Sequence, residues 1–244
     1  MASRRQFLAF SVAAMTAGAA SAGLSGCQRT GNPDLPTRRV LFLGNSYTDD
    51  NGGLDQFLAG LAPNTTVARV APGGMTLNQH ATNPATLALL SPEHAWELVV
   101  LQEQSQLPVR DPRAYAAGAA ALAGRIRAAG ALAALLQTWA RPDSAGVTAA
   151  ALAEATTRVA GSIGATVVPA GNAFAASLSA APTIQLSQAD GHPTVAGSYL
   201  AACVCYSVLF STSPVGNSYG AGLPEDAVAH LQRVAATATG RRAG

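Results

Sequence analysis

From residue 38 onward, the sequence alternates short apolar runs with longer segments of helical periodicity, and this alternation constrains the fold more than any other feature. The short runs are residues 40–43, 67–70, 98–101, 132–136 and 166–168. Such runs are typical of strands that are buried on both faces of a parallel sheet. Helical patterns occupy residues 113–129, 148–163, 195–210 and 225–237. The sequence therefore predicts an α/β fold, a three-layer α/β/α sandwich with a central parallel sheet of about five strands.

The composition excludes several classes of protein. Hydrophobic residues make up 49% of the 244 residues and charged residues 11%, which is too apolar for a disordered chain and sufficient for one domain with a substantial core. All 15 basic residues are arginine, and without lysine there is no P-loop, no lysine Schiff base and no Ser-x-x-Lys nucleophile. Because no basic run is interleaved with aromatic residues, we expect no nucleic-acid partner.

The first residues are arranged like an export signal. Arg4 and Arg5 precede an apolar stretch of small residues that extends to Leu24, which is the charge and hydrophobicity order of a leader peptide. The paired arginines, followed by Phe7 and Leu8, resemble the twin-arginine signal. The alternative is a single transmembrane anchor, but the hydroxyl residues and glycines of the stretch make a weak membrane span.

A cysteine ends this leader. The sequence Leu-Ser-Gly-Cys at residues 24–27 resembles the lipobox of bacterial lipoproteins, in which the cysteine becomes the lipidated first residue. The alternative is an ordinary cysteine in a discarded leader. We expect an export signal over residues 1–26, a tether over 27–37 and one domain over 38–244. A lipid anchor at Cys27 would hold that domain at the outer face of the cell membrane or in the cell envelope.

Residues 195–210 are nearly all apolar but too few to span a bilayer, which predicts a helix buried inside the domain. Cys203 and Cys205 lie two positions apart in this segment, where helical side chains diverge and cannot form a disulfide with each other. We expect two buried thiols and no metal site.

Two motifs lie near opposite ends of the predicted domain. Residues 41–48 read Leu-Phe-Leu-Gly-Asn-Ser-Tyr-Thr, and Asp190-Gly191-His192-Pro193 lie toward the C-terminus. These motifs resemble the first and last blocks of the SGNH, or GDSL, hydrolases, and the resemblance covers most of the predicted domain in block order. It implies a flavodoxin-like fold and hydrolysis of an ester without a metal or a cofactor.

The resemblance implies that Ser46 is the nucleophile, His192 the general base and Asp190 the residue that orients His192. A serine hydroxyl is a weak nucleophile until a base removes its proton, and the base needs a third group to hold its tautomer. Asp190 and His192 are one residue closer than in the usual Asp-x-x-His. In an extended loop, residues i and i+2 point the same way, so the carboxylate would still approach the ring. Otherwise a backbone carbonyl orients His192, and activity would survive loss of Asp190.

The resemblance also implies three donors for the oxyanion: the Ser46 N–H, the Gly74 N–H and an amide side chain after the third strand. Each donor lowers the barrier by roughly 3 kcal/mol in other hydrolases. Where the family has Gly-x-Asn-Asp, this chain reads Gln-Glu-Gln-Ser at residues 102–105. Alignment of the strand ends places Gln104 at the asparagine, with Gln102 as its rival.

Each of these residues also has an ordinary structural interpretation. Ser46 could be a helix N-cap, His192 a hydrogen-bonded loop histidine, and Asp190 part of a common turn. Their occurrence together, in block order with Gly74, favours a catalytic site. Trp139 follows the fourth strand and would form either a wall of the substrate pocket or part of the core. The remaining histidines have no ligand-like spacing and are expected at the surface or in packing rather than on zinc: His80, His94 and His230.

Residues 216–220 read Gly-Asn-Ser-Tyr-Gly and satisfy the Gly-x-Ser-x-Gly nucleophile elbow of α/β-hydrolases. That motif requires a preceding strand, followed later by an acid and then a histidine. Here a predicted helix precedes it, and Asp226 and His230 lie four residues apart on one predicted helix. We therefore reject Ser218 as a nucleophile.

The sequence thus predicts a serine hydrolase that acts on an ester through an acyl-enzyme, with a carbohydrate O-acetyl ester or another short acyl ester as the favoured substrate. A lipase or thioesterase on the same scaffold is an alternative, because a fold does not fix its substrate. An acyltransferase is a second alternative. A third is a non-catalytic glycan-binding lipoprotein that has kept the pocket and lost the chemistry.

Overall fold

The computed structural model describes residues 38–241 and contains a five-stranded sheet in which all neighbouring strands are parallel. The order across the sheet is β2-β1-β3-β4-β5. The strands are β1 (Arg39–Leu43), β2 (Thr66–Val70), β3 (Leu98–Leu101), β4 (Leu132–Leu136) and β5 (Thr166–Val168). The predicted α/β sandwich is confirmed.

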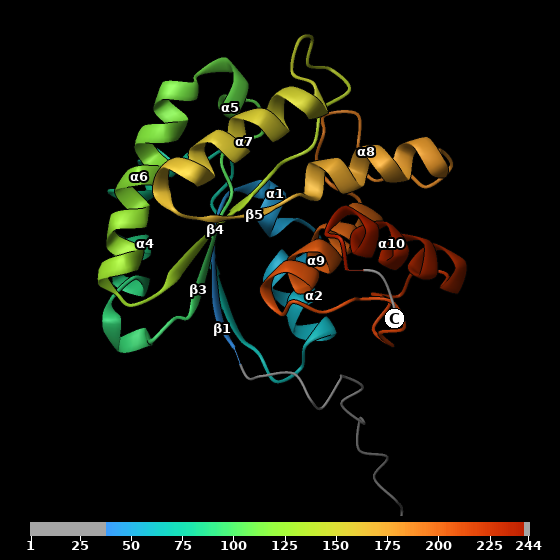
Figure 1. Ribbon diagram of the computed structural model, residues 1–244, viewed down its shortest axis with the longest axis horizontal. Helices are drawn as coiled ribbons and strands as arrows, with labels where there is room; N and C mark the ends of the chain where they lie inside the picture. The colour runs from blue at the N-terminus through green and yellow to red at the C-terminus, as the bar shows by residue number, and fades with distance from the viewer. Residues whose placement is uncertain (1–37, 242–244) are drawn as a thin grey trace, which may run out of the picture.

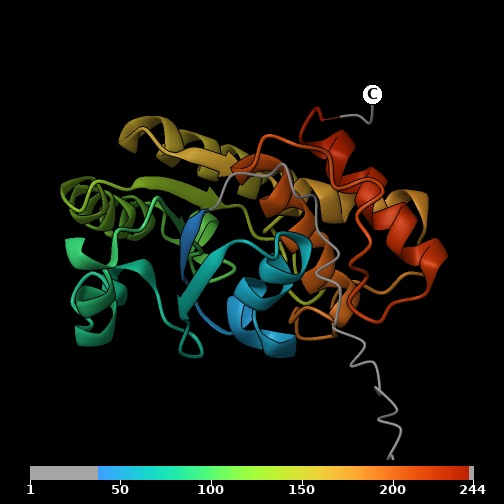
Figure 2. The ribbon, with the colours of Figure 1, turned by 90° about the horizontal axis from the view of Figure 1, so that it is seen from below.

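Helices cover both faces of the sheet (Figure 1). The layer on the right of Figure 1 consists of α2 (Leu54–Leu61), α8 (Ala170–Ala180), α9 (Val195–Leu209) and α10 (Glu225–Ala238). The opposite layer contains α3 (Leu77–His80), α4 (Pro84–Leu89), α5 (Leu107–Arg110), α6 (Pro112–Ala128) and α7 (Ala149–Ile163). Short turns complete the chain at α1 (Ser46–Asp49), η1 (Asp50–Gly52) and η2 (Pro92–His94). Seen from below, the two helical layers flank the sheet (Figure 2).

Two hydrophobic cores lie between the sheet and its helical layers. Val40 and Phe42 of β1 belong to the core beneath α2, α9 and α10, whereas Leu41 and Leu43 belong to the core beneath α6. Successive side chains of a strand point to opposite faces, so a strand buried on both sides must be apolar at every position. This requirement explains the continuous apolar runs of the sequence.

The predicted elements agree closely with the structure. The five strands and the four predicted helices begin and end within one residue of the expected positions. The sequence did not predict α2, α8 or the shorter helices α3, α4 and α5. α8 consists mainly of alanine and other small residues, so its apolar stripe is weak. It is held in place because Ala173 and Phe174 are buried in the core beneath α9.

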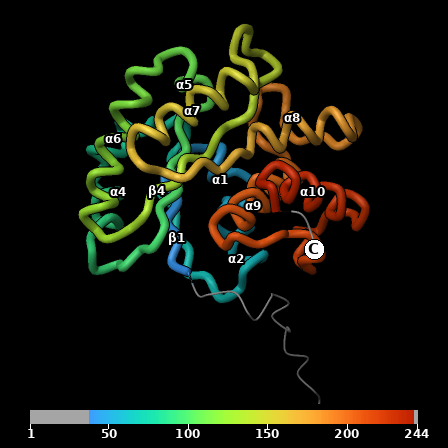
Figure 3. The backbone as a smooth tube through the Cα atoms, in the orientation of Figure 1, coloured from blue at the N-terminus to red at the C-terminus, as the bar shows by residue number. Residues whose placement is uncertain are grey.

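As predicted, α9 is a buried helix. Almost all of its side chains are buried, including Cys203 and Cys205, which are free thiols at 0% exposure. Their separation along one helix keeps the sulfur atoms from pairing. α9 packs against α2 and α10, and the three helices lie beside one another in the backbone trace (Figure 3).

The topology places one crevice at the carboxyl ends of the strands. β1 lies between β2 and β3, so the chain leaves β1 toward one side of the sheet and later continues on the other side. In open α/β sheets, ligands bind at such a switch point. Ser46 lies three residues after the end of β1 at this place, and Gln104 lies in the loop that follows β3.

Candidate active site

Ser46 is the first residue of α1, and the preceding residue forms the helix cap. Asn45 accepts a hydrogen bond from the Tyr47 N–H through its side-chain oxygen. Ser46 is therefore not the N-cap, which was its ordinary structural interpretation. Its side chain is partly exposed, and Ser46 Oγ lies 2.9 Å from His192 Nε2.

A carboxylate lies on the other side of the histidine ring. Asp190 Oδ2 is 2.9 Å from His192 Nδ1, and Asp190 Oδ1 accepts a hydrogen bond from the His192 backbone N–H at 3.1 Å. These donors, the backbone N–H first and then the ring, hold the pKa of the Asp190 carboxyl below its ordinary value. The shortened spacing between the two residues thus allows the carboxylate to reach the ring.

The route by which Asp190 reaches the ring differs from the extended loop that we expected. Gly191 has a φ of +86°, and its N–H donates to the Gln188 carbonyl, so the segment is a turn. The Gln188 N–H donates to the His192 carbonyl at 2.7 Å and closes that turn. A side chain at position 191 would be strained at this φ, which is why a glycine lies between the two residues.

Trp139 holds this turn in place through a hydrogen bond. Its indole N–H donates to the Gly191 carbonyl at 2.9 Å, and its side chain is 2% exposed. The Trp139 ring is stacked between Tyr47, with a centroid distance of 4.8 Å, and Phe174, with a centroid distance of 4.0 Å. Of the two positions that the sequence allowed, Trp139 therefore takes the one in the core, and it supports the loop that carries the histidine.

The loop after β2 approaches the same place. Gly74 is exposed, has a φ of +71°, and has open space where a side chain would begin. The Asn45 amide nitrogen donates to the Met75 carbonyl at 3.0 Å, which ties this loop to the residue before Ser46. The backbone near Gly74 is therefore held beside α1 and is open to an approaching ligand.

Gln102 is a structural residue of the crevice floor. Its side-chain oxygen accepts hydrogen bonds from the Asn45 N–H at 3.0 Å and from Thr48 Oγ1 at 2.9 Å. Its side-chain nitrogen donates to Asn45 Oδ1 and to the Glu103 carbonyl. The side chain is 1% exposed, so both ends of the amide are engaged inside the protein.

Gln104 is placed differently. Its side-chain oxygen accepts hydrogen bonds from the Gln106 and Leu107 N–H groups at 2.9 and 3.1 Å. Its amide nitrogen has a long contact of 3.4 Å with Ser105 Oγ, and the residue is partly exposed. The oxygen end is thus anchored by two hydrogen bonds to backbone N–H groups, and the nitrogen end has one long contact within the same loop.

Sequence reasoning missed two buried polar residues of the crevice. Asn45 links the loops after β1, β2 and β3 through its amide, and it appeared in the sequence only as part of the serine motif. Glu103 is 2% exposed and accepts hydrogen bonds from backbone N–H groups of two loops. An acidic residue between two glutamines gives no sequence signal of burial.

The remaining histidines have structural roles. His80 is fully buried, and its ring nitrogens lie 2.7 Å from the Gly44 carbonyl and 2.8 Å from Thr86 Oγ1. His94 stacks on Trp96. His230 lies 3.0 Å from Ser177 Oγ on the neighbouring helix. Within residues 38–241 there is no group of three or more His, Cys, Asp or Glu side chains that could hold a metal ion.

The Gly-x-Ser-x-Gly sequence at residues 216–220 lies in the loop between α9 and α10, so a helix precedes it. This loop is fastened to two helices. Asn217 donates through its amide to the Leu61 carbonyl at 2.8 Å, and Tyr199 donates through its hydroxyl to the Tyr219 carbonyl at 2.7 Å. The motif therefore forms a loop that is hydrogen-bonded to two helices, and it lacks the strand that a nucleophile elbow requires.

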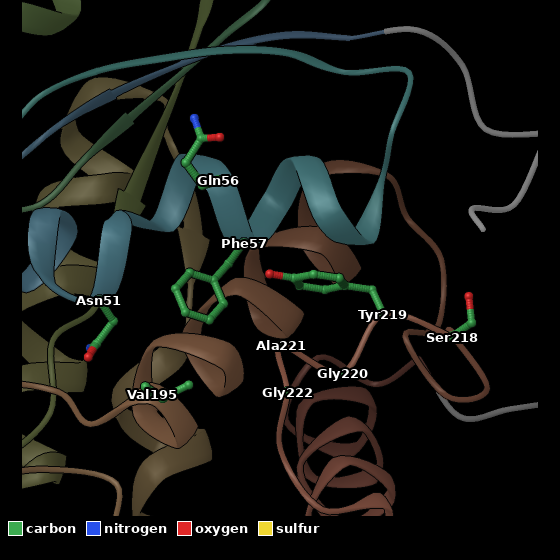
Figure 4. A pocket seen from close by; sticks show the side chains of 9 residues that line it. All are labelled: Asn51, Gln56, Phe57, Val195, Ser218, Tyr219, Gly220, Ala221 and Gly222. Carbon is green, nitrogen blue, oxygen red and sulfur yellow. The ribbon is translucent and has the colours of Figure 1, made fainter. Parts of the chain in front are cut away.

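A groove of about 560 Å³ lies beside this loop (Figure 4). Phe57 from α2 and Tyr219 from the loop point toward each other across it, and Val195 lies at the start of α9. At one end, the Asn51 amide donates to the Pro193 carbonyl at 3.0 Å. The groove therefore borders the segment that directly follows the candidate histidine.

Comparison with known proteins decides the family. No protein-family profile matches the chain, and no curated protein matches it in sequence. A solved structure from Slackia heliotrinireducens, assigned to the SGNH hydrolases, is 32% identical, covers 71% of this chain and 100% of its own, and has a TM-score of 0.64. The chain belongs to the SGNH hydrolase family.

More distant solved structures share the fold. A DUF4886 family protein from Bacteroides uniformis is 19% identical and covers 83% of this chain and 95% of its own, with a TM-score of 0.70. An acetyl xylan esterase is 14% identical and covers 70% of this chain and 99% of its own, with a TM-score of 0.53. Membership of the SGNH hydrolase family supports an enzyme that hydrolyses esters, and these two more distant neighbours support the fold.

Proposed function

We propose that Ser46, His192 and Asp190 form the catalytic triad of this SGNH hydrolase. The observation that carries the proposal is the continuous chain of contacts: 2.9 Å from Ser46 Oγ to His192 Nε2, and 2.9 Å from His192 Nδ1 to Asp190 Oδ2. In this geometry His192 accepts the serine proton as Ser46 attacks the ester carbonyl. The Asp190 carboxylate fixes the tautomer of the ring and stabilises the imidazolium that forms.

The attack produces a tetrahedral intermediate with a negative oxygen, which needs donors that are already in place. In α1, the Tyr47 N–H is bonded to the Asn45 side chain, and the Thr48 N–H to the Asn45 carbonyl. This leaves the Ser46 N–H for the oxyanion, together with the N–H of Gly74. Collapse of the intermediate expels the alcohol, which takes the proton from His192. Water then hydrolyses the acyl-enzyme by the same route.

Gln104 is the third donor in this proposal. The side-chain oxygen of Gln104 is anchored and the residue is partly exposed, which suits a group that must donate to a ligand without moving. The Gln102 amide nitrogen is already engaged with Asn45 and with the Glu103 carbonyl. The contacts of the two side chains therefore favour Gln104 over Gln102.

For the substrate we favour a short acyl ester, and among these an O-acetyl ester of a carbohydrate. An acetyl xylan esterase is among the proteins that share the fold. The predicted export signal would place the enzyme where envelope or external polysaccharide is found. A series of p-nitrophenyl esters from acetate to decanoate, followed by acetylated sugars, tests the choice. A preference for decanoate would contradict it.

We also propose that Cys27 carries a lipid anchor after export. Cys27 and the leader before it lie outside the described residues. Among the residues that the structure does describe, no helix is long and apolar enough to cross a membrane. Cys27→Ser is expected to release the protein from the membrane fraction, and retention of the variant there would contradict the anchor.

A fluorophosphonate probe, which reacts with activated serine hydroxyls, tests the catalytic proposal. Wild-type protein is expected to be labelled, Ser46→Ala to lose labelling, and Ser218→Ala to be labelled like wild type. Glycan binding without labelling of the wild type at any pH would instead support a non-catalytic binding lipoprotein.

A further inference from the structure

Glu103 is a buried carboxylate between the two loops that carry the proposed oxyanion donors. Its side chain is 2% exposed. Oε1 accepts a hydrogen bond from the Gln104 N–H at 2.7 Å and lies 3.2 Å from the Leu77 nitrogen, while Oε2 lies 3.3 Å from that nitrogen. One carboxylate thus binds the backbone of the β3–α5 loop and the first residue of α3.

These two backbone groups are not donors themselves, but they lie on the segments that carry two of the proposed donors. Leu77 is three residues after Gly74 and begins the helix that ends the Gly74 loop. Gln104 supplies the proposed side-chain donor, and its backbone N–H is the one that Glu103 binds. A shift of either loop would move a donor relative to Ser46, and misplacement by about 1 Å is enough to lower a rate by two orders of magnitude.

Burial makes an ionised carboxylate costly, and an amide or an apolar group would fill the same space at lower cost. Burial raises the pKa of the Glu103 carboxyl to about 7. The hydrogen bonds from the Gln104 and Leu77 N–H groups act in the opposite direction and favour the ionised form. From α6, the buried Tyr115 interacts electrostatically with Glu103. Burial raises the pKa of Tyr115, and the Glu103 charge adds to that rise. From α3, His80 has both ring nitrogens engaged elsewhere, and burial lowers its pKa.

We propose that Glu103 is a positioning residue that holds the Gly74 and Gln104 arms of the oxyanion hole together, and that the ionised form is the active one. This inference rests on the proposed triad chemistry. A carboxylate accepts from both N–H groups at once. Protonation removes the charge and weakens both hydrogen bonds, and the new O–H group faces N–H groups that cannot accept a hydrogen bond. The two arms therefore loosen, and the transition state loses stabilisation.

Glu103→Gln tests this role, because the amide has the same shape but offers one acceptor and a donor that faces backbone N–H groups. We expect kcat for p-nitrophenyl acetate to fall roughly 10- to 100-fold while KM changes less than about twofold. Glu103→Asp, which keeps the charge on a shorter side chain, is expected to recover part of the loss. Glu97→Gln is the matched control, because Glu97 precedes the other end of β3 and pairs with Arg38.

The pH profile separates positioning from a merely structural role. Because Glu103 must lose a proton for full activity, log kcat/KM against pH is expected to rise more steeply on the acid side in the wild type than in Glu103→Gln. An unchanged kcat and slope in Glu103→Gln, with wild-type labelling by fluorophosphonate, would overturn the inference and leave the triad intact. Absence of labelling in the wild type would instead contradict the proposed function. If Glu103→Gln does not fold, equal kcat values for Glu103→Asp and the wild type would also overturn the inference.

Discussion

Ser46 Oγ and His192 Nε2 lie 2.9 Å apart, although 146 residues separate them in the chain. The parallel sheet brings this about, because Ser46 follows a central strand and His192 precedes α9, which packs against the same face as α2. The two residues that the sequence singled out are thus neighbours in the fold.

Loss of the Asp190 carboxylate is expected to impair catalysis and leave stability nearly unchanged. In Asp190→Asn, an amide faces the His192 ring, so the ring is held in the wrong tautomer, and kcat should fall roughly 100-fold or more. Asp143→Asn is the control, because Asp143 also forms an ion pair, with Arg141, but both residues lie in the loop that follows β4. Full activity in Asp190→Asn would show that another group orients the histidine.

Gln104 and Gln102 are expected to respond in opposite ways to truncation. Gln104→Ala should lower kcat roughly 100-fold with the free energy of unfolding little changed, because a donor to the transition state is lost. Gln102→Ala should destabilise the protein by about 2–4 kcal/mol, because Asn45 and Thr48 lose buried hydrogen-bond partners. Kinetics and urea denaturation of both variants check the assignment, and the reverse pattern would make Gln102 the donor.

Trp139→Phe tests whether the indole N–H positions the Asp190–His192 turn. Phenylalanine keeps a ring between Tyr47 and Phe174 but removes the hydrogen bond to the Gly191 carbonyl. We expect kcat to fall about tenfold, because the histidine is less firmly held. Trp96→Phe also removes one indole hydrogen bond, to the Leu89 carbonyl, but lies in the other core and is expected to keep kcat. Equal effects of the two variants would argue against positioning.

The pH dependence of stability follows from the raised pKa of Glu103. The pKa of Glu103 is about 7 in the folded protein, and its ordinary value of 4.5 applies to the unfolded chain. Between these two pH values the folded chain therefore holds a proton that the unfolded chain has released. The resulting stability is fully present below pH 4.5 and is lost as the pH rises through 7, by about 3 kcal/mol. Urea denaturation from pH 4.5 to 8 measures this loss. The free energy of unfolding of the wild type should fall by this amount relative to that of Glu103→Gln, which has no carboxyl at this position. A constant difference would contradict the raised pKa.

Much of the fold was predictable because its signals are local. A strand buried on both faces needs an apolar residue at each position, and β1 and β3 show this directly as continuous runs. Ser46 was predictable for a related reason: the crevice of such a sheet lies at the carboxyl ends of its strands, so the residues just after them are the ones to examine.

The rest depends on contacts that are distant in the sequence. The conformation at Gly191 is set by Trp139, Gln188 and the backbone around it, and glycine alone allows both the turn and the extended form. Likewise, Gln102 and Gln104 differ in their contacts because Asn45, Thr48 and the Glu103 carbonyl engage the amide of Gln102. The burial of Glu103 follows from the packing of two loops, which no local pattern records.

The central claim is that Ser46 is the nucleophile and His192 its base, and steady-state hydrolysis of p-nitrophenyl acetate tests it most directly. The purified wild-type protein would be compared with Ser46→Ala, His192→Ala and the serine control Ser218→Ala. The account predicts that the first two variants lose roughly a thousandfold or more in kcat/KM, while Ser218→Ala retains wild-type activity. A wild-type rate no faster than that of Ser46→Ala, or a comparable loss in Ser218→Ala, would contradict it.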